Sequence, residues 1–469
     1  MTPPAPTTSG TRRAPAVPGR VDTVSARRVA LPAGPAIDPW SLAGDDGIVL
    51  ADGGRVLIGL GTALRLDLPG GLADGDGVDR AAADLAAVAC DDRLAPGTTS
   101  LRPVLAFAAL PFDRHRAAAL TVPAVLYCRE PDGSEWVTVT ADADADRTPD
   151  EEPSALRERL VARALRPRHD GGPTTWRIRP RSTDAEFEDR VARAVGAIDR
   201  HEVAKVVLAR RVDVAIDRAP DVAAVLRRWA ALEPSCTLFS LPTPDGRFVG
   251  ASPELLIERS GVRFRSRPLA GTTDRVHAAD STLPAALLES AKDTDEHRHV
   301  VDAIRDVLAP WSEDLRVPER PELVHLHNIT HLGTTIEGTL RPRPDGGVPD
   351  ALHLVSLLHP TPAVGGVPRA AALGLIDQLE DGSRGSYAGP VGWMDGAGDG
   401  RFVVGIRAMT VGEGTVALTA GVGIVSGSRP EVELRETGLK FAAVFDALAP
   451  GVPFDTSTPP GPGGHAVSG

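Results

Sequence analysis

The stretch of residues 183–211 reads TDAEFEDRVARAVGAIDRHEVAKVVLARR, in which a helix signal is followed directly by a strand signal. Thr183 and Glu186 have the spacing of a capping box, which predicts an amphipathic helix from Thr183 to about Arg200. The apolar run that begins at Lys205 predicts a buried strand. A helix beside a buried strand is typical of a protein of mixed α and β structure.

Strand and helix signals continue on both sides of this stretch. Residues 36–140 alternate short apolar runs with Gly, Asp and Pro clusters, which is typical of strands and turns. The segment GLGTA at 59–63 is similar to a nucleotide-binding loop, but an alternating strand pattern follows it, so we interpret it as a turn. Downstream we expect several strands, a long helix over about 284–308 and a last helix over about 431–448.

These patterns predict one folded domain, residues 36–448, with flanking segments. Residues 1–35 are rich in Pro, Thr, Arg and Ala, residues 449–469 are rich in Pro and Gly, and we expect both to be disordered. Residues 141–181 hold polar low-complexity stretches around a short helix near 156–165, which indicates a surface insertion. The candidate functional residues all fall in the part 182–448.

Composition excludes several classes of protein. The 469 residues include 51 basic and 63 acidic side chains, a net charge of −12, whereas nucleic-acid phosphates require a basic surface. No apolar run reaches the ~18 residues of a membrane span, and the N-terminal arm lacks the apolar region of a secretory signal. Cys90, Cys128 and Cys236 fit neither a disulfide framework nor a paired metal knuckle. We therefore expect a cytoplasmic monomer that binds neither nucleic acid nor a membrane.

Lysine is rare in this chain. Only Lys205, Lys292 and Lys440 occur among the 51 basic residues, and the other 48 are arginines. Each lysine is therefore a candidate for a position where arginine cannot serve, although an ordinary surface position is the alternative. Lysine is compact, and burial can lower its pKa. Because Lys205 leads into a buried strand, it is a candidate base.

Two predicted helices carry pairs of acids. Asp293 and Glu296 are three residues apart, as are Glu433 and Glu436, so each pair projects from one helix face. Four carboxylates from two helices would form an oxygen-only site, which suits Mg²⁺. Solvated helix charges are the alternative for either pair alone. Lys440 lies on the face of the second pair, which favours a site for an ion and an anion together.

Histidines offer a competing zinc hypothesis. His325, His327 and His331 lie close together in the sequence, and His297 and His299 fall in another short stretch. Alternate histidines on a strand can bind zinc, but no helical motif of acid and histidine accompanies them. Hydrogen bonding in or near a site is the more frequent role of such residues, so we prefer magnesium.

Glu254 lies among apolar neighbours in GASPELL at 250–256. Such surroundings keep a carboxyl group protonated, as a general acid must be. The alternative is a charge at the edge of a strand.

Nine separated blocks, in order, resemble the chorismate-utilising enzymes, and within them the isochorismate synthases. The similarity covers about residues 180–448. The blocks are KVVLAR (205–210), GASPELL (250–256), PLAGT (268–272), EH (296–297), HPTPAVGG (359–366), YAG (387–389), IR (406–407), AGVGIV (420–425) and RETGLK (435–440). Nine blocks in order are far more specific than any one of them.

The resemblance implies an α/β (α+β) fold, the chorismate-binding fold of anthranilate synthase component I. In this fold a single large domain contains two packed, mainly antiparallel sheets with helices outside. The resemblance also implies a magnesium site at one end of the core. Glu296 and Glu436 would be its ligands, and Asp293 and Glu433 would support them directly or through water.

It further implies how chorismate, a dicarboxylate, would bind. Its ring carboxylate would contact the metal and the backbone amides near Gly421 and Gly423. Its enolpyruvyl carboxylate would be held by Arg407, Lys440 and Tyr387, since a guanidinium fork matches a carboxylate. The other residues expected around the ring are Gly271, where glycine permits close approach of the backbone, and Thr272, His331, Ala363, Val364 and Ile406.

The implied reaction is that of an isomerase, isochorismate synthase. Lys205 would remove a proton from water that attacks C2, and Glu254 would protonate the hydroxyl that leaves C4. Anthranilate and aminodeoxychorismate synthases use ammonia and generally lack a lysine at this place, so Lys205 favours water.

Two alternatives stay open. A salicylate synthase, or another chorismate lyase of the family, would add pyruvate elimination to the same first step. A catalytically inactive binding module belongs to another class, and the joint presence of base, acid and all four metal-side acids argues against it. Isochorismate serves siderophore and menaquinone biosynthesis, and both pathways fit the sequence.

Overall fold

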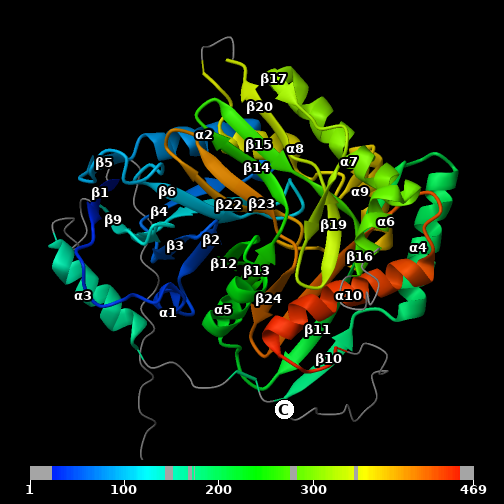
Figure 1. Ribbon diagram of the computed structural model, residues 1–469, viewed down its shortest axis with the longest axis horizontal. Coiled ribbons are helices and arrows are strands. Elements are labelled where there is room, and N and C mark those ends of the chain that lie inside the picture. The colour runs from blue at the N-terminus through cyan, green and yellow to red at the C-terminus, as the bar shows by residue number, and fades with distance from the viewer. Residues whose placement is uncertain are drawn as a thin grey trace, which may run out of the picture.

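The computed structural model describes residues 24–142, 151–166, 172–173, 175–274, 283–342 and 347–454. Its strands form a 13-stranded sheet, a nine-stranded sheet and a three-stranded sheet. Figure 1 shows the strands in the centre, with α4, α6, α7 and α10 on one side of them and α1 and α3 on the other. The predicted fold class, with two large sheets and outer helices, is confirmed.

The 13-stranded sheet contains the strand predicted at Lys205. Its order is β10 (Trp176–Pro180), β11 (Lys205–Ile216), β25 (Thr415–Ile424), β24 (Ala408–Gly412), β13 (Gly246–Ser252), β12 (Thr237–Thr243), β2 (Ile48–Asp52), β3 (Arg55–Leu60), β8 (Val125–Arg129), β9 (Glu135–Asp142), β1 (Val24–Ala30) and β5 (Ala89–Asp92), with β21 (Gly366–Val367) beside β11. Among the strand pairs of the described residues, only β1 and β5 are parallel.

The other two sheets are antiparallel. The nine-stranded sheet has the order β17 (Ser312–Arg316), β20 (Ile336–Leu340), β15 (Arg263–Arg267), β14 (Leu255–Ser260), β23 (Gly400–Val404), β22 (Pro390–Asp395), β6 (Leu105–Ala109), β7 (Ala118–Val122) and β4 (Leu64–Leu68). The small sheet has the order β16 (Leu269–Asp274), β19 (Ile329–Gly333) and β18 (Glu322–His325).

Apolar side chains of the two large sheets pack against each other. Leu50 and Phe239 from the 13-stranded sheet share one buried cluster with Phe107 and Val391 from the nine-stranded sheet. Their burial removes apolar surface from water, which is the main force that holds two sheets together.

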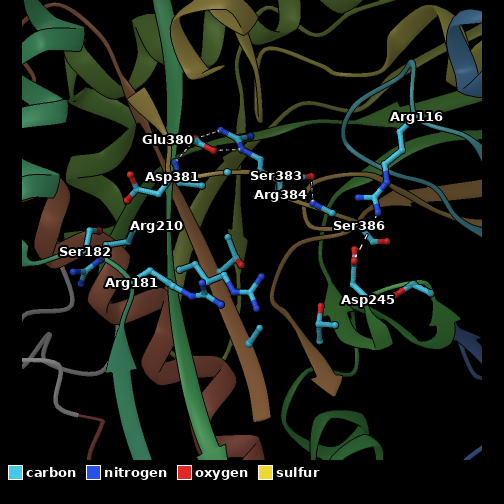
Figure 2. A pocket seen from close by; sticks show the side chains of 18 of the residues that line it. Arg116, Arg181, Ser182, Arg210, Asp245, Glu380, Asp381, Ser383, Arg384 and Ser386 are labelled. Carbon is cyan, nitrogen blue, oxygen red and sulfur yellow. Dashed lines mark hydrogen bonds and ion pairs between the residues drawn. The ribbon is translucent and has the colours of Figure 1, made fainter. Parts of the chain in front are cut away.

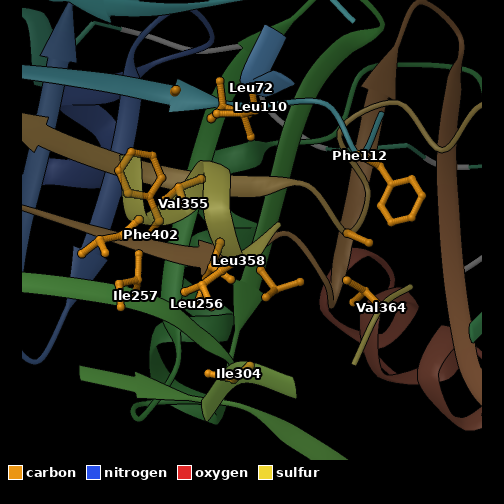
Figure 3. Close-up of a cluster of buried hydrophobic side chains, with 14 of the residues drawn as sticks. Leu72, Leu110, Phe112, Leu256, Ile257, Ile304, Val355, Leu358, Val364 and Phe402 are labelled. Atoms are coloured by element: carbon orange, nitrogen blue, oxygen red, sulfur yellow. The ribbon is translucent and has the colours of Figure 1, made fainter. Parts of the chain in front are cut away.

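Helices cover the outer faces. They are α1 (Pro39–Ala43), α2 (Gly75–Ala86), α3 (Pro153–Ala164), α4 (Asp184–Asp199), α5 (Val222–Leu232), α6 (Leu283–Glu289), α7 (Ala291–Leu308), α8 (Ala351–Leu358), α9 (Arg369–Leu379) and α10 (Pro430–Leu448), with short 3₁₀ turns η2 (Gly71–Ala73) and η3 (Ala309–Trp311). The largest buried cluster includes Leu256 of β14, Phe402 of β23 and Leu358 of α8, and extends to Val364 (Figure 3). Val364, which the sequence places in the substrate pocket, is therefore part of the buried core.

Several predicted elements are confirmed. Thr183 and Glu186 form the capping box of α4, and β11 begins at Lys205. In the segment 59–63, Gly59 and Leu60 end β3 and residues 61–63 form the turn that leads to β4. The predicted helix over 284–308 is wrong as a single helix, because Ser290 has extended backbone angles and its side chain accepts a hydrogen bond from the Asp293 amide. A serine in this position caps a new helix, α7.

The predicted boundaries also need correction. Residues 24–30, expected in the disordered arm, form β1, which pairs with β9 and β5. The segment 141–181 is not a surface insertion throughout, because β10 pairs with β11 and the α3 residues Leu156 and Leu160 are buried. Phe454 packs against Phe441 and Phe445, so the packed part extends beyond residue 448. Residues 1–23, the polar stretches 143–150 and 167–171, and residues 455–469 lie outside the described residues.

Candidate active site

Lys205 is fully buried at the start of β11. Its neighbour in the sheet is Val367 of β21, and its side chain has zero exposure. Nζ lies 3.0 Å from Glu296 Oε1 on α7 but makes no hydrogen bond of standard geometry. A Cβ atom at position 423 would lie 2.0 Å from Glu296 Oε1 and 3.1 Å from Lys205 Cε, so only glycine leaves room for this pair.

Glu254 lies where the chain crosses from one large sheet to the other, between β13 and β14. Its side chain is buried, and its carboxylate accepts a hydrogen bond from the Leu269 amide. Burial raises the pKa of Glu254 to about 7, against the opposing effects of Lys205 and Arg407. Glu254 therefore has the raised pKa that the sequence predicts, and its role as an acid stays a prediction.

His331 on β19 connects β16 to Arg407. Nδ1 lies 3.0 Å from the Gly271 carbonyl oxygen and 3.1 Å from Thr272 Oγ1, and Arg407 donates to Nε2 over 2.9 Å. Because a carbonyl only accepts and a guanidinium only donates, we assign the proton to Nδ1. Burial and the charges of Arg407 and Lys440 hold the pKa of His331 well below its usual value, so the ring is neutral.

Arg407 and Gly271, on either side of His331, both have positive φ angles. Arg407 has φ 51° and Gly271 has φ +73°. Non-glycine residues seldom adopt this backbone region, so the Arg407 side chain is aimed into the site at a conformational cost of about 1–3 kcal/mol.

Gly421 on β25 connects two further predicted residues. Its amide donates to the Tyr387 hydroxyl oxygen, and its carbonyl accepts from Lys440 Nζ over 2.8 Å. A substrate carboxylate that bound the Gly421 amide would replace this hydrogen bond with Tyr387, and the predicted contact stays a prediction.

Each of the three lysines faces one of the predicted metal-binding glutamates. The ion pairs are Lys205–Glu296 at 3.0 Å, Lys292–Glu433 at 2.7 Å and Lys440–Glu436 at 2.6 Å. Almost all basic residues of this chain are arginines, but these three are lysines. The pattern makes an ordinary surface role for them a poor explanation.

The fourth acid, Asp293, accepts a hydrogen bond from the Ser290 hydroxyl at the start of α7, and its own amide donates to that hydroxyl oxygen. Burial raises the pKa of Asp293, and the charges of Glu296 and Glu436 add to the effect. Burial and the charge of Glu436 likewise raise the pKa of Glu433. Burial alone would raise the pKa of Glu436, but Lys440 and its other partners lower it overall. The acids of α7 and α10 therefore lie close enough to influence one another.

The chemistry of these acids suits a magnesium ion. Their donors are all carboxylate oxygens, which Mg²⁺ prefers. Glu433 Oε2 is buried and makes no hydrogen bond of standard geometry, although the Ser428 hydroxyl lies near the carboxylate. Within the described residues, however, no three His, Cys, Asp or Glu side chains are grouped closely enough to hold an ion as they stand. The glutamates are turned to the lysines instead. The histidines proposed for zinc make other contacts: His297 Nε2 lies 2.7 Å from Thr334 Oγ1, and His325 Nδ1 lies 3.1 Å from Thr330 Oγ1.

One cavity brings most of the predicted residues together. Its lining includes Glu254, Gly271, Thr272, Glu296, His331, Ala363, Val364, Tyr387, Ile406, Arg407, Gly421, Gly423, Glu436 and Lys440. Lys205 lies behind Glu296 and Gly423, and Asp293 and Glu433 lie outside the lining. Every residue predicted to contact the substrate thus borders a single space.

Sequence reasoning missed Arg384, which also lines this cavity. Its buried guanidinium binds both carboxylate oxygens of Glu380 and donates to the carbonyls of Val207 and Val364. Glu380 in turn accepts from the Ala209 amide, so the pair fixes β11 to the loop that carries Val364. Figure 2 shows this pair in the wall of a second, arginine-lined cavity. Nothing in a chain with 48 arginines singled Arg384 out.

Comparisons with known proteins show the family to which this fold belongs. A sequence model of the family described as "Chorismate binding enzyme" matches residues 86–449. "Putative isochorismate synthase MenF" of Mycobacterium tuberculosis is 40% identical over 377 residues, which cover 76% of this chain and 90% of that protein. Isochorismate synthase EntC of Escherichia coli is 41% identical over 265 residues, covering 56% and 66% respectively.

A solved structure agrees in fold. The menaquinone-specific isochorismate synthase MenF from Escherichia coli superposes with a TM-score of 0.73 at 24% identity, covering 93% of this chain and 96% of the other. The chain belongs to the family of chorismate-binding enzymes. Of the helices in the described residues, none combines the length and apolar character needed to cross a membrane.

Proposed function

We propose that this protein is an isochorismate synthase, an isomerase that converts chorismate to isochorismate. The observation that carries the proposal is a pair of buried groups: Glu254, which lines the cavity and has a pKa raised to about 7, and Lys205, which has zero exposure and lies directly behind the cavity residues Glu296 and Gly423. Water addition at C2 with loss of hydroxide from C4 requires a base and an acid at one ring. The relatives named isochorismate synthase support the same assignment.

In this proposal Lys205 gives up its ion pair with Glu296 and releases a proton to solvent before turnover, and the neutral amine then removes a proton from the attacking water. Glu254 protonates the departing hydroxyl. Arg407 and Lys440 bind the enolpyruvyl carboxylate, and the neutral His331 ring orients Arg407 through its 2.9 Å contact. Arg384 and Glu380 hold the pocket wall at Val207 and Val364 in place.

Glu296 and Glu436 would hold magnesium, supported by Asp293 and Glu433. When bound, magnesium would neutralise the ring carboxylate of the substrate. We therefore expect chorismate to be converted to isochorismate in magnesium buffer and not in excess EDTA. Chromatographic separation of isochorismate, salicylate and anthranilate checks both points. Full turnover in EDTA would reject the metal requirement, and salicylate as the main product would favour a lyase.

The raised pKa of Glu254 predicts a pH limit on activity. Its carboxyl is protonated below about pH 7 and ionised above it, and only the protonated form can act as an acid. We expect kcat/KM to fall by about tenfold per unit above that pH, because this parameter reports groups of the free enzyme. The measurement is a pH profile at constant ionic strength and saturating magnesium. A profile that stays level to about pH 9 would contradict the assignment.

A cytoplasmic location and a monomeric state stay predictions from the sequence. The names of the relatives support the synthase rather than the salicylate-forming alternative.

A further inference from the structure

Lys292 holds a carboxylate in an unusual way. It is the second residue of α7, and its Nζ donates to Glu433 Oε1 on α10 over 2.7 Å. The Glu433 side chain is 1% exposed and that of Lys292 is 34% exposed, so the lysine covers the carboxylate from the solvent side. The other oxygen, Glu433 Oε2, is buried and makes no hydrogen bond of standard geometry, although the Ser428 hydroxyl lies near the carboxylate and lowers its pKa.

A buried unpaired carboxylate oxygen is costly, so it calls for an explanation. It belongs to a carboxylate whose pKa the charge of Glu436 raises, which places the two acids near each other. This oxygen lies at the edge of the proposed magnesium site and could still accept a hydrogen bond or coordinate a metal ion. A metal ion or a water bound to it is the chemistry that would satisfy that oxygen.

An arginine at position 292 would bind this oxygen as well. A guanidinium presents a fork that takes both oxygens of a carboxylate, whereas an ammonium is a single point of charge. The chain itself shows the difference. Arg384 binds Glu380 through Nε to Oε2 at 2.9 Å and Nη2 to Oε1 at 2.5 Å. Arg28 binds Asp92 in the same two-point way, at 2.9 and 2.5 Å.

We propose that Lys292 is a positioning residue for the metal: it holds Glu433 by one oxygen and leaves the second free for the ion or its water. The proposal rests on the proposed magnesium site. It also explains why position 292 is one of only three lysines in a chain with 48 arginines.

The test compares metal binding by Lys292→Arg, Lys292→Gln and the wild type. Metal-free protein without chorismate is titrated with Mn²⁺, and free Mn²⁺ is measured by electron paramagnetic resonance. We expect Lys292→Arg to bind Mn²⁺ about 10–100-fold more weakly, the usual effect of changing a residue that orients a metal ligand. Lys292→Gln, whose amide can still donate to Oε1 alone, should bind more tightly than Lys292→Arg. If charge alone mattered, Lys292→Arg would bind Mn²⁺ as tightly as the wild type, because both carry one positive charge beside the site.

A double-mutant cycle identifies the partner. In a Glu433→Gln background, Lys292→Arg should cause no further loss, because the oxygen that it would cover is gone. Circular dichroism and thermal unfolding show whether each variant folds. If Lys292→Arg does not fold, Lys292→Gln is compared with Lys292→Met, which cannot donate, and we expect the glutamine variant to bind more tightly.

The outcomes separate the two proposals. A wild type that does not bind Mn²⁺ would overturn the magnesium site and the inference with it. A wild type that binds Mn²⁺, with equal affinity in Lys292→Arg, would overturn only the role of Lys292. A further loss in the Glu433→Gln background would show that Lys292 acts through another group.

Discussion

Lys205→Arg is expected to abolish isochorismate formation while the protein still folds and binds metal. A base must spend part of its time neutral, and a guanidinium with a pKa above ~12 does not. General base catalysis typically contributes ~10²–10⁴ in rate, so we expect a loss of kcat in that range. Steady-state assays with chorismate and magnesium measure it.

Folding is the main control, because Lys205 is fully buried and packs beside Gly423 and Glu296. Lys205→Met has a similar length and no charge, so it separates loss of a base from loss of packing. Circular dichroism and Mn²⁺ titration are run on both variants. Isochorismate formation by Lys205→Arg at a rate near that of the wild type would reject the base and direct attention to another group.

Glu254→Gln is expected to keep chorismate affinity and lose turnover. The amide fits the same buried space and can still accept from the Leu269 amide, but it cannot protonate a leaving hydroxyl. The expected loss in kcat is again ~10²–10⁴. Calorimetry measures chorismate binding separately, with the fall in kcat read from the assay.

Residual activity gives this prediction a second readout. The decline above pH 7 that we assign to Glu254 should be missing from the residual activity of Glu254→Gln, because the titrating group has been removed. A loss of less than about threefold, or an unchanged pH profile, would exclude Glu254 as the acid.

Local signals in the sequence predicted the elements that carry the site. The capping box at Thr183 and the apolar run from Lys205 predict α4 and β11, because each depends on neighbours a few residues away. Glu254 was predicted to have a raised pKa from its apolar neighbours alone. The prediction of one helix over 284–308 was wrong, because the Ser290 side chain caps a new helix and divides the segment into α6 and α7.

Other features depend on contacts that are distant in sequence. Residues 24–30 form a strand because β9 and β5 lie beside them, and β10 is a strand because it pairs with β11. The Tyr387 contact with Gly421 depends on segments that meet only in the fold. The three lysines were singled out by their rarity, but their pairing with three glutamates of α7 and α10 could not be read from spacing.

The central claim is that the protein adds water to C2 of chorismate while hydroxide leaves C4. The most direct test is turnover of chorismate by the wild-type enzyme in H₂¹⁸O, followed by mass spectrometry of the isochorismate. We predict one ¹⁸O atom per molecule of newly formed isochorismate, located at C2. Isochorismate formed without ¹⁸O would contradict the claim, because its C2 oxygen would then have come from the substrate rather than from water.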